Sequence, residues 1–239
     1  MPTYVITGAR AGIGLECTRQ LSTSLHNTIV AVVRDITADL TDLNSLLAAS
    51  DARAQVHIVE GNLASPESLG TLTSRLPQGL KVDVLIQNAA ILLPVARTET
   101  ALSLTIGSMN AHFATNVIGP TLLLQALAPL LAPGAVVANI SSGVGSMTQI
   151  SDGRVNAEYP AYSISKAALN MLTVHQAAEL KGKAIVVCVA PGHVKTQMGG
   201  PTAKMEVADS ASNVLRTLST LENKDTGKFL YYDGTSKPW

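Results

Sequence analysis

The fold is decided at the start of the chain, where residues 4–14 read Tyr4-Val5-Ile6-Thr7-Gly8-Ala9-Arg10-Ala11-Gly12-Ile13-Gly14. The short apolar run predicts a buried strand, and the glycines after it predict a tight turn into a helix. Such a turn lets the backbone approach a pyrophosphate, whose charge is met by amide N–H groups at the positive helix end. An ordinary glycine-rich turn is the alternative interpretation. The residues of this turn that we expect to bind a nucleotide are Gly8, Arg10, Gly12, Ile13 and Gly14.

Similar apolar runs recur along the chain and indicate further strands. With the first, they are Tyr4–Thr7, Ile29–Val33, Val56–Val59, Val82–Gln87, Ala135–Ser141, Ala184–Ala190 and Phe229–Tyr231. Nearly continuous β-branched runs are typical of parallel strands that helices bury on both faces. The helices predicted between them cover Gly12 to about Leu25, Ala38–Ala49, Pro66–Arg75, Leu102–Leu131, Ala161–Leu180 and Val207–Leu221. This alternation predicts an α/β fold: a Rossmann-type, doubly wound, parallel seven-stranded sheet that forms one NAD(P)-binding domain over residues 1–239.

Two features interrupt the regular pattern. The helix Leu102–Leu131 contains Pro120 and Pro129, which we expect to mark a kink and an end. The stretch Val144–Pro160 shows no sustained period and predicts a loop above the carboxyl edge of the sheet, where ligands bind in such folds.

Composition excludes several classes of protein. The chain is 46% apolar and 14% charged, with 17 basic and 17 acidic residues, so it favours neither nucleic acid nor an anionic membrane surface. We find no basic leader with an apolar core and no apolar run near eighteen residues, and we expect a cytoplasmic protein. Cys17 and Cys188 are expected as buried thiols, and the histidines show no ligand spacing, so we expect no metal.

A possible proton donor lies in the run Tyr162-Ser163-Ile164-Ser165-Lys166. Residues four apart share one face of a helix, which would place the Lys166 ammonium beside the Tyr162 phenol. One positive charge at roughly 5 Å would lower the pKa of a tyrosine by about two units from its usual value near 10. A surface helix with an unrelated Tyr and Lys is the alternative.

The end of the second strand indicates which dinucleotide would bind. An acidic side chain there accepts hydrogen bonds from a free ribose 2′-OH, whereas this chain has Val32-Val33-Arg34-Asp35. The planar guanidinium of Arg34 suits a 2′-phosphate, and Arg10 could add a second cation. We expect NADP(H), with Asp35 as a displaced ribose acceptor the alternative.

The glycine turn, the tyrosine–lysine pair and Pro191-Gly192 occur in the order found in the short-chain dehydrogenase/reductase (SDR) family, which the chain resembles from Thr3 to about Thr235. Twenty positions separate Ser142 from Tyr162, and with the run Ser141-Ser142-Gly143-Val144-Gly145-Ser146 this is similar to C-factor-like carbonyl reductases and fungal ketoreductases of the norsolorinic acid type.

The resemblance implies roles for further residues. Asn88 and Ala89 would lie beside the adenosine ribose, and Asn62 and Leu63 beside the adenine. Asn116 matches a helix asparagine whose distorted backbone holds a water that relays protons to the lysine. Ser142 matches the serine that donates to the substrate carbonyl. The turn after the sixth strand would bind the cofactor through Pro191, Gly192, Val194 and Thr196, with Val194 and Thr196 touching the nicotinamide carboxamide.

The catalytic set implied by the resemblance is therefore Asn116, Ser142, Tyr162 and Lys166, with Tyr162 and Lys166 also touching the cofactor. The expected activity is reversible, NADPH-dependent reduction of a ketone or aldehyde, a small hydrophobic or polyketide-like molecule of secondary metabolism. A non-redox lyase, isomerase or dehydratase and a cofactor-sensing binding protein are the alternatives. Relatives often pair through two helices, which implies a homodimer or homotetramer. The expected pocket edge is Leu92, Leu93, Pro94, Met147, Ile150, Tyr159, Met198 and Met205.

Overall fold

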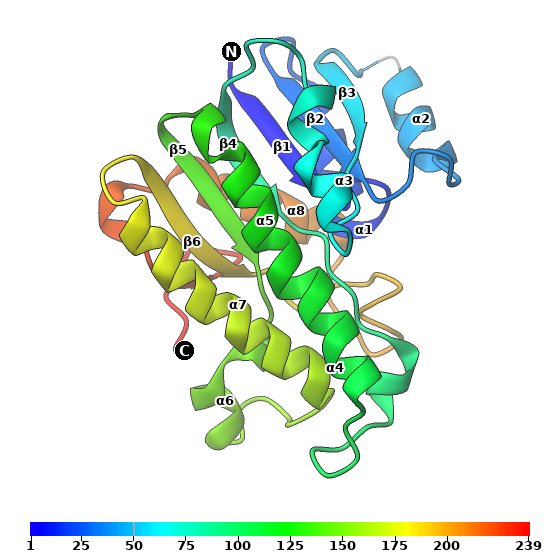
Figure 1. Cartoon of the computed structure of the whole chain (residues 1–239), viewed down its shortest axis with the longest axis vertical. Coiled ribbons are helices and arrows are strands. Elements are labelled where there is room, and N and C mark those ends of the chain that lie inside the picture. The colour runs from blue at the N-terminus through cyan, green and yellow to red at the C-terminus, as the bar shows by residue number, and fades with distance from the viewer. Residues whose placement is uncertain (50) are drawn as a thin grey trace.

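A computed structural model describes residues 1–49 and 51–239, and seven strands in it form one parallel sheet (Figure 1). The order across the sheet is β3-β2-β1-β4-β5-β6-β7. The change of direction between β1 and β4 opens a crevice at the carboxyl ends of the strands, where such sheets bind ligands. The strands are β1 (Thr3–Thr7), β2 (Thr28–Val33), β3 (Gln55–Glu60), β4 (Val82–Gln87), β5 (Leu131–Ile140), β6 (Ala184–Ala190) and β7 (Phe229–Tyr231).

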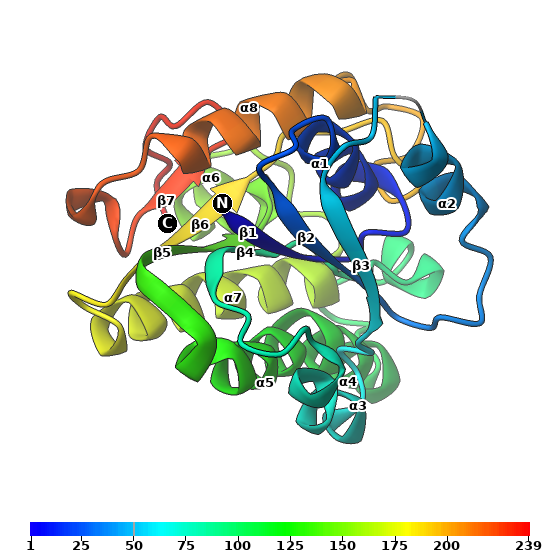
Figure 2. The same cartoon turned by 90° about the horizontal axis from the view of Figure 1, so that it is seen from above.

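Helices cover both faces of the sheet, as Figure 2 shows. One face carries α1 (Gly12–Ser22), α2 (Thr41–Ala48) and α8 (Val207–Ser219). The other carries α3 (Pro66–Gly70), α4 (Ile106–Phe113), α5 (Gly119–Leu127) and α7 (Pro160–Glu179). Each face has its own apolar core: Val5 and Leu123 belong to one, and Ile6 and Val214 to the other. The predicted doubly wound α/β fold is confirmed.

The stretch predicted as one helix over Leu102–Leu131 is built from several pieces. A π-helical turn (Ala114–Ile118) joins α4 to α5, and a 3₁₀ turn (Ala128–Leu130) containing Pro129 ends the run. Residues 106–130 carry no charged side chain and are long and apolar enough to cross a membrane, contrary to the expectation that no run comes close. In this fold α5 instead buries Leu123 and Leu127 against the sheet.

The predicted loop Val144–Pro160 also needs correction. It contains most of a 3₁₀ turn (Gly143–Gly145) and a short helix, α6 (Met147–Ser151). The Ser146 hydroxyl caps that helix by accepting a hydrogen bond from the Gln149 amide at 3.2 Å. Five residues are too few to show a helical period, which is why the pattern missed α6.

Other boundaries differ by a few residues because polar groups end the elements. Helix α1 stops at Ser22, before the predicted Leu25, where the Ser22 carbonyl accepts hydrogen bonds from the amides of Arg53 and Ala54. Helix α2 begins at Thr41, whose amide donates to the Asp39 carboxylate at 2.9 Å.

Candidate active site

A cleft of about 1070 Å³ runs along the carboxyl ends of the strands. Many residues predicted from the sequence line it, although they come from elements far apart in the chain. Those residues are Gly8, Arg10, Gly12, Ile13, Arg34, Asn62, Leu63, Asn88, Ala89, Tyr162, Lys166, Pro191 and Thr196. Gly14, Asn116, Ser142, Gly192 and Val194 are not part of this lining.

The glycine turn after β1 is crowded in a way that only glycine permits. Gly8 and Gly12 have φ values of 70° and 57°. A Cβ on Gly14 would lie 2.5 Å from the Gly8 carbonyl oxygen and 2.6 Å from Asn88 Nδ2. Gly14 therefore shapes the turn from behind, while Gly8 and Gly12 face the cleft. The cradle fits the pyrophosphate of a dinucleotide at the start of α1.

Asn88 and Ala89 hold this turn against β4. Asn88 Nδ2 donates to the Thr7 carbonyl at 2.9 Å, and the Ala89 amide donates to Thr7 Oγ1 at 3.0 Å. The two residues thus tie the end of β4 to the end of β1 at the point where the strand order reverses.

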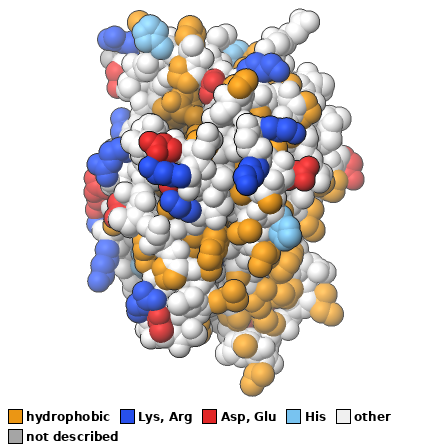
Figure 3. Space-filling model, turned by 90° about the vertical axis from the view of Figure 1, so that its left-hand side faces the viewer, with side chains coloured by type: hydrophobic (Ala, Val, Ile, Leu, Met, Phe, Trp, Pro, Cys, Tyr) orange, Lys and Arg blue, Asp and Glu red, His pale blue; other side chains and the backbone are white. Residues whose placement is uncertain are grey.

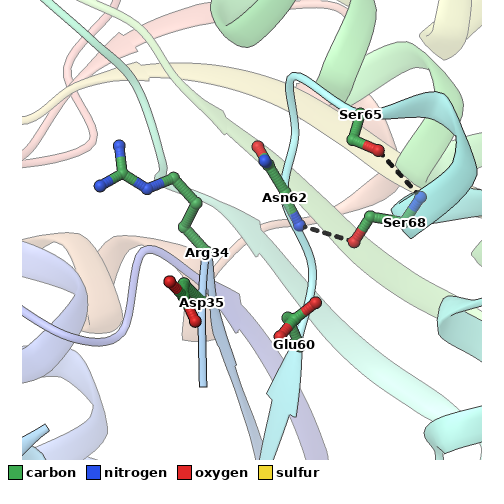
Figure 4. A pocket seen from close by; sticks show the side chains of 6 residues that line it. All are labelled: Arg34, Asp35, Glu60, Asn62, Ser65 and Ser68. Carbon is green, nitrogen blue, oxygen red and sulfur yellow. Dashed lines mark hydrogen bonds between the residues drawn. The ribbon is translucent and has the colours of Figure 1, made fainter. Parts of the chain in front are cut away.

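A side pocket of about 310 Å³ lies at the ends of β2 and β3, lined by Arg34, Asp35, Glu60, Asn62, Ser65 and Ser68 (Figure 4). The Arg34 side chain extends from the strand end, and the Asp35 carboxylate points in a different direction. Asp35 Oδ1 accepts from the amide and hydroxyl of Thr37 at 2.8 and 2.7 Å, which holds the pKa of this carboxyl below its usual value. Asp35 is thus already engaged as an acceptor, whereas Arg34 lines both this pocket and the main cleft.

Tyr162 and Lys166 are brought together and buried, at 8% and 2% exposure. They lie one turn apart on α7, and the Lys166 ammonium nitrogen is 5.6 Å from the centre of the Tyr162 ring. Lys166 Nζ donates to the carbonyl oxygen of Ile140, at the end of β5, at 2.8 Å.

The expected lowering of the Tyr162 pKa is wrong. Burial raises the pKa of Tyr162 to about 12, and a hydrogen bond with Ser142 offsets only part of the effect. Burial likewise lowers the pKa of Lys166 to about 8. Desolvation is the largest cause of both shifts because both groups lie away from water.

Two serines follow β5, and their surroundings distinguish them. The Ser141 hydroxyl is buried and donates to Asn170 Oδ1 at 2.7 Å, so it holds the strand to α7. Ser142 is half-buried and is the serine that interacts with the Tyr162 phenol. Ser141 lines the cleft but is engaged with Asn170, whereas Ser142 is the serine that influences the pKa of Tyr162.

Asn116 lies in the π-helical turn between α4 and α5 and is 1% exposed. Its side chain accepts from the Ile91 amide at 2.8 Å and donates to the Ile91 carbonyl and to Ser165 Oγ, each at 3.0 Å. The side chain is therefore fully used in joining the end of β4 to α7. The backbone distortion expected from the resemblance is present here.

The turn after β6 borders the cleft from the other side. Thr196 Cγ2 lies 3.2 Å from the position of a Cβ on Gly12, so this segment packs against the glycine turn. Gly192 has a φ of 92°, and Val194 is buried and pairs with Met205. His193 Nε2 lies 2.9 Å from the Gly199 carbonyl oxygen, which gives this histidine a structural role in the segment.

Comparison with known proteins identifies the family. The family model described as short chain dehydrogenase matches residues 2–207. The chain belongs to the short-chain dehydrogenase family. It is 31% identical to an uncharacterized oxidoreductase of Schizosaccharomyces pombe over 99% of this chain and 97% of the relative. It is also 37% identical to the C-signal protein of Myxococcus xanthus, over 66% of this chain and 93% of that protein.

Among solved structures, this short-chain dehydrogenase is similar to an NADPH-bound carbonyl reductase from chicken fatty liver. The TM-score is 0.85 at 30% identity, over 100% of this chain and 99% of the other. The predictions of the family and of an oxidoreductase are thereby confirmed.

One residue of this short-chain dehydrogenase that the sequence did not single out is His112. It is fully buried on α4, and its ring meets the Tyr162 ring edge-on at 6.3 Å. His112 Nε2 accepts from the Leu93 amide at 3.3 Å, so Nδ1 carries the proton and donates to the Ser108 carbonyl at 2.7 Å. The sequence could have indicated this role, because His112 lies one helical turn before Asn116 and so on the same face of the helix.

The predicted pocket edge is only partly observed. Leu93 and Met198 line the cleft, whereas the other six candidates are absent from its lining. Met147 is 66% exposed on α6, and Met205 packs where a Cβ on Gly192 would lie. An apolar residue in a loop does not reveal from its type alone which way it points.

Proposed function

We propose that this protein reduces a ketone or aldehyde to an alcohol with NADPH as the reductant. The observation that carries the proposal is the buried pair of Tyr162 and Lys166 in the lining of the cleft, with the half-buried Ser142 beside the Tyr162 phenol. NADPH supplies the hydride, and the residues of this chain bind, orient and move protons.

Tyr162 donates the proton to the carbonyl oxygen. Its pKa of about 12 keeps the phenol protonated at neutral pH, so the donor is loaded before each turnover. Ser142 donates a hydrogen bond to the same oxygen as negative charge develops on it. Lys166, with a pKa of about 8, is mainly cationic at neutral pH and stabilises the tyrosinate left behind. Asn116, which joins Ile91 to the Ser165 hydroxyl next to Lys166, would hold a water that returns a proton through Lys166, as the resemblance implies.

The choice of NADPH rests on the side pocket. Arg34 and Arg10 supply cations at the adenosine end of the cleft, and Asp35 is already bonded to Thr37. Hydrogen bonds from Thr41 are the main cause of the lowered pKa of Asp39, and the charge of Arg10 adds to it, which places that charge near this edge. The likeness to an NADPH-bound carbonyl reductase supports the same choice.

Substrate access favours an apolar carbonyl compound. Leu93, Ile91 and Met198 line the cleft near Tyr162, so a small hydrophobic or polyketide-like molecule suits it. We also propose that the protein acts in the cytoplasm and that its substrate belongs to secondary metabolism.

A single experiment separates this proposal from its rivals. The full-length protein is mixed with NADPH or NADH and with a panel of aromatic aldehydes, aliphatic ketones, α-diketones and quinones, and the loss of reduced-cofactor absorbance is followed. We expect turnover with NADPH and weaker turnover with NADH. Conversion of substrate without cofactor oxidation would point to a lyase or isomerase. Tight NADPH binding without any turnover would point to a cofactor-sensing protein.

We also propose that the protein is a homodimer or homotetramer. A stripe of apolar side chains at helical spacing follows the outer face of α7: Ile164, Ala167, Met171, Val174 and Ala178. Ile118 is 49% exposed on the neighbouring helical run. Figure 3 shows hydrophobic side chains gathered in the lower right of the face that it presents. Light scattering of the protein as it elutes from a size-exclusion column gives its mass and tests this proposal. The double variant Met171→Glu, Val174→Glu should be a monomer.

A further inference from the structure

The segment Lys237–Trp239 packs against the chain that follows Ser142, although nearly a hundred residues separate them. The Ser146 hydroxyl donates to the Pro238 carbonyl at 2.7 Å, and the Thr148 amide donates to the main-chain oxygen of Trp239 at 2.8 Å. The Trp239 ring stacks on Phe229 of β7, with centroids 5.3 Å apart and planes 26° from parallel. These contacts hold α6 to the edge of the sheet.

Lys237 is the most unusual member of the segment because its ammonium is buried, at 6% residue exposure. Lys237 Nζ lies 4.1 Å from the centre of the Tyr231 ring and 5.6 Å from that of Phe229. It donates to Gln149 Oε1 on α6, and Gln149 Nε2 donates to the Tyr231 hydroxyl. A buried ammonium held by an amide and two ring faces costs desolvation, so its position needs an explanation beyond packing.

The far side of the same turn rests on the catalytic helix. A Cβ on Gly145 would lie 3.0 Å from Lys166 Cβ, so the turn Gly143–Gly145 packs directly on α7. Asn170 Nδ2 donates to the Gly145 carbonyl at 2.9 Å. Lys237 Nζ is also 3.8 Å from the position of a Cβ on Gly143, the residue next to Ser142. The turn is thus held between α7 on one side and Lys237–Trp239 on the other.

We infer that Lys237–Trp239 is a clamp that positions Ser142 opposite Tyr162, with Lys237 and Trp239 acting as positioning residues through α6 and the turn Gly143–Gly145. This role rests on the proposed carbonyl reduction. An oxyanion donor displaced by a fraction of an ångström loses much of its effect in the transition state. The clamp should therefore affect kcat more than KM, and it should leave NADPH binding at the distant Arg34 end unchanged.

A double-mutant cycle tests the clamp through the residue on which it acts. Lys237→Met should lower kcat about tenfold for the best carbonyl compound of the panel, with the NADPH Kd changed less than about twofold. In a Ser142→Ala background the same change should lower kcat by less than about twofold. Trp239→Ala should lower kcat as much as Lys237→Met does. Trp239→Phe, which keeps an aromatic ring on Phe229, should retain most of kcat. The matched control is Lys181→Met, which removes one exposed lysine beyond α7.

Hydrogen–deuterium exchange gives a second readout that needs no substrate. Lys237→Met and Trp239→Ala should raise exchange of the amides in residues 143–151 about tenfold, and Lys181→Met should not. Equal effects of Lys237→Met with and without Ser142, or no effect on kcat, would overturn the clamp. If the wild-type protein reduces no carbonyl compound, the proposed function fails, and unchanged exchange in residues 143–151 would then reject the clamp separately.

Discussion

The two ends of the cleft are built by different means. At the nucleotide end the site is formed mainly by backbone, and its shape requires glycines without side chains. A single methyl group added at Gly14 would overlap the Gly8 carbonyl. At the catalytic end the site is formed by side chains buried at a desolvation cost, since both Tyr162 and Lys166 have strongly shifted pKa values. One end should fail when atoms are added, and the other when polar atoms are removed.

The largest expected effect comes from removing one such atom. Tyr162→Phe deletes the proton donor and keeps the ring against His112, so kcat should fall by about 10²–10⁴-fold. NADPH binding, measured by fluorescence titration, should change little because Arg34 and the glycine turn are untouched. Reduction at near the wild-type rate would show that the proton comes from another group.

The sequence predicted the nucleotide end more completely than the catalytic end. The glycine turn and Arg34 lie within or directly after local elements, and a contiguous pattern specifies local geometry. The catalytic end brings together Ile140, Ser142 and α7, and no local pattern shows that burial is the main cause of the shift in the Tyr162 pKa. His112 and Lys237 were missed for the same reason, since their roles come from contacts with distant elements.

The second prediction concerns how the buried Lys166 at the catalytic end makes the stability of the protein depend on pH. The pKa of Lys166 is about 8 in the folded protein against 10.5 for the free side chain, so the unfolded chain binds more protons between these values. The free energy of unfolding should therefore rise with pH from about 8 to about 10.5, by roughly 3 kcal/mol from this residue alone.

Lys166→Met should abolish that rise. Urea unfolding at a series of pH values measures it, and the free energy of unfolding of the wild type should increase relative to that of the variant as pH rises through this window. Lys181→Met, which changes an exposed lysine, should keep the wild-type pH dependence. An identical pH profile for Lys166→Met would mean that Lys166 is solvated and not buried.

The third effect adds an atom at the nucleotide end. Gly14→Ala should destabilise the protein by about 1–3 kcal/mol and weaken NADPH binding, because the new methyl group meets a backbone oxygen that cannot move alone. The control is Gly107→Ala in α4, where nothing lies within 4 Å of the added Cβ. That change should leave stability equal or raise it by about 0.5–1 kcal/mol. Thermal unfolding with and without NADPH compares the two, and equal behaviour would remove the steric basis of the turn.

The smallest effect concerns the Arg34 side chain at the nucleotide end. Arg34→Glu should lower the ratio of kcat/KM for NADPH to that for NADH by about tenfold, because a charge-assisted bond to the 2′-phosphate becomes a repulsion. Asp35→Ser is the matched control: its carboxylate is bonded to Thr37, so the ratio should hardly change. If the ratio shifts with Asp35→Ser and not with Arg34→Glu, Asp35 is the ribose contact. The nucleotide end would then discriminate by an acceptor in the loop and not by the guanidinium.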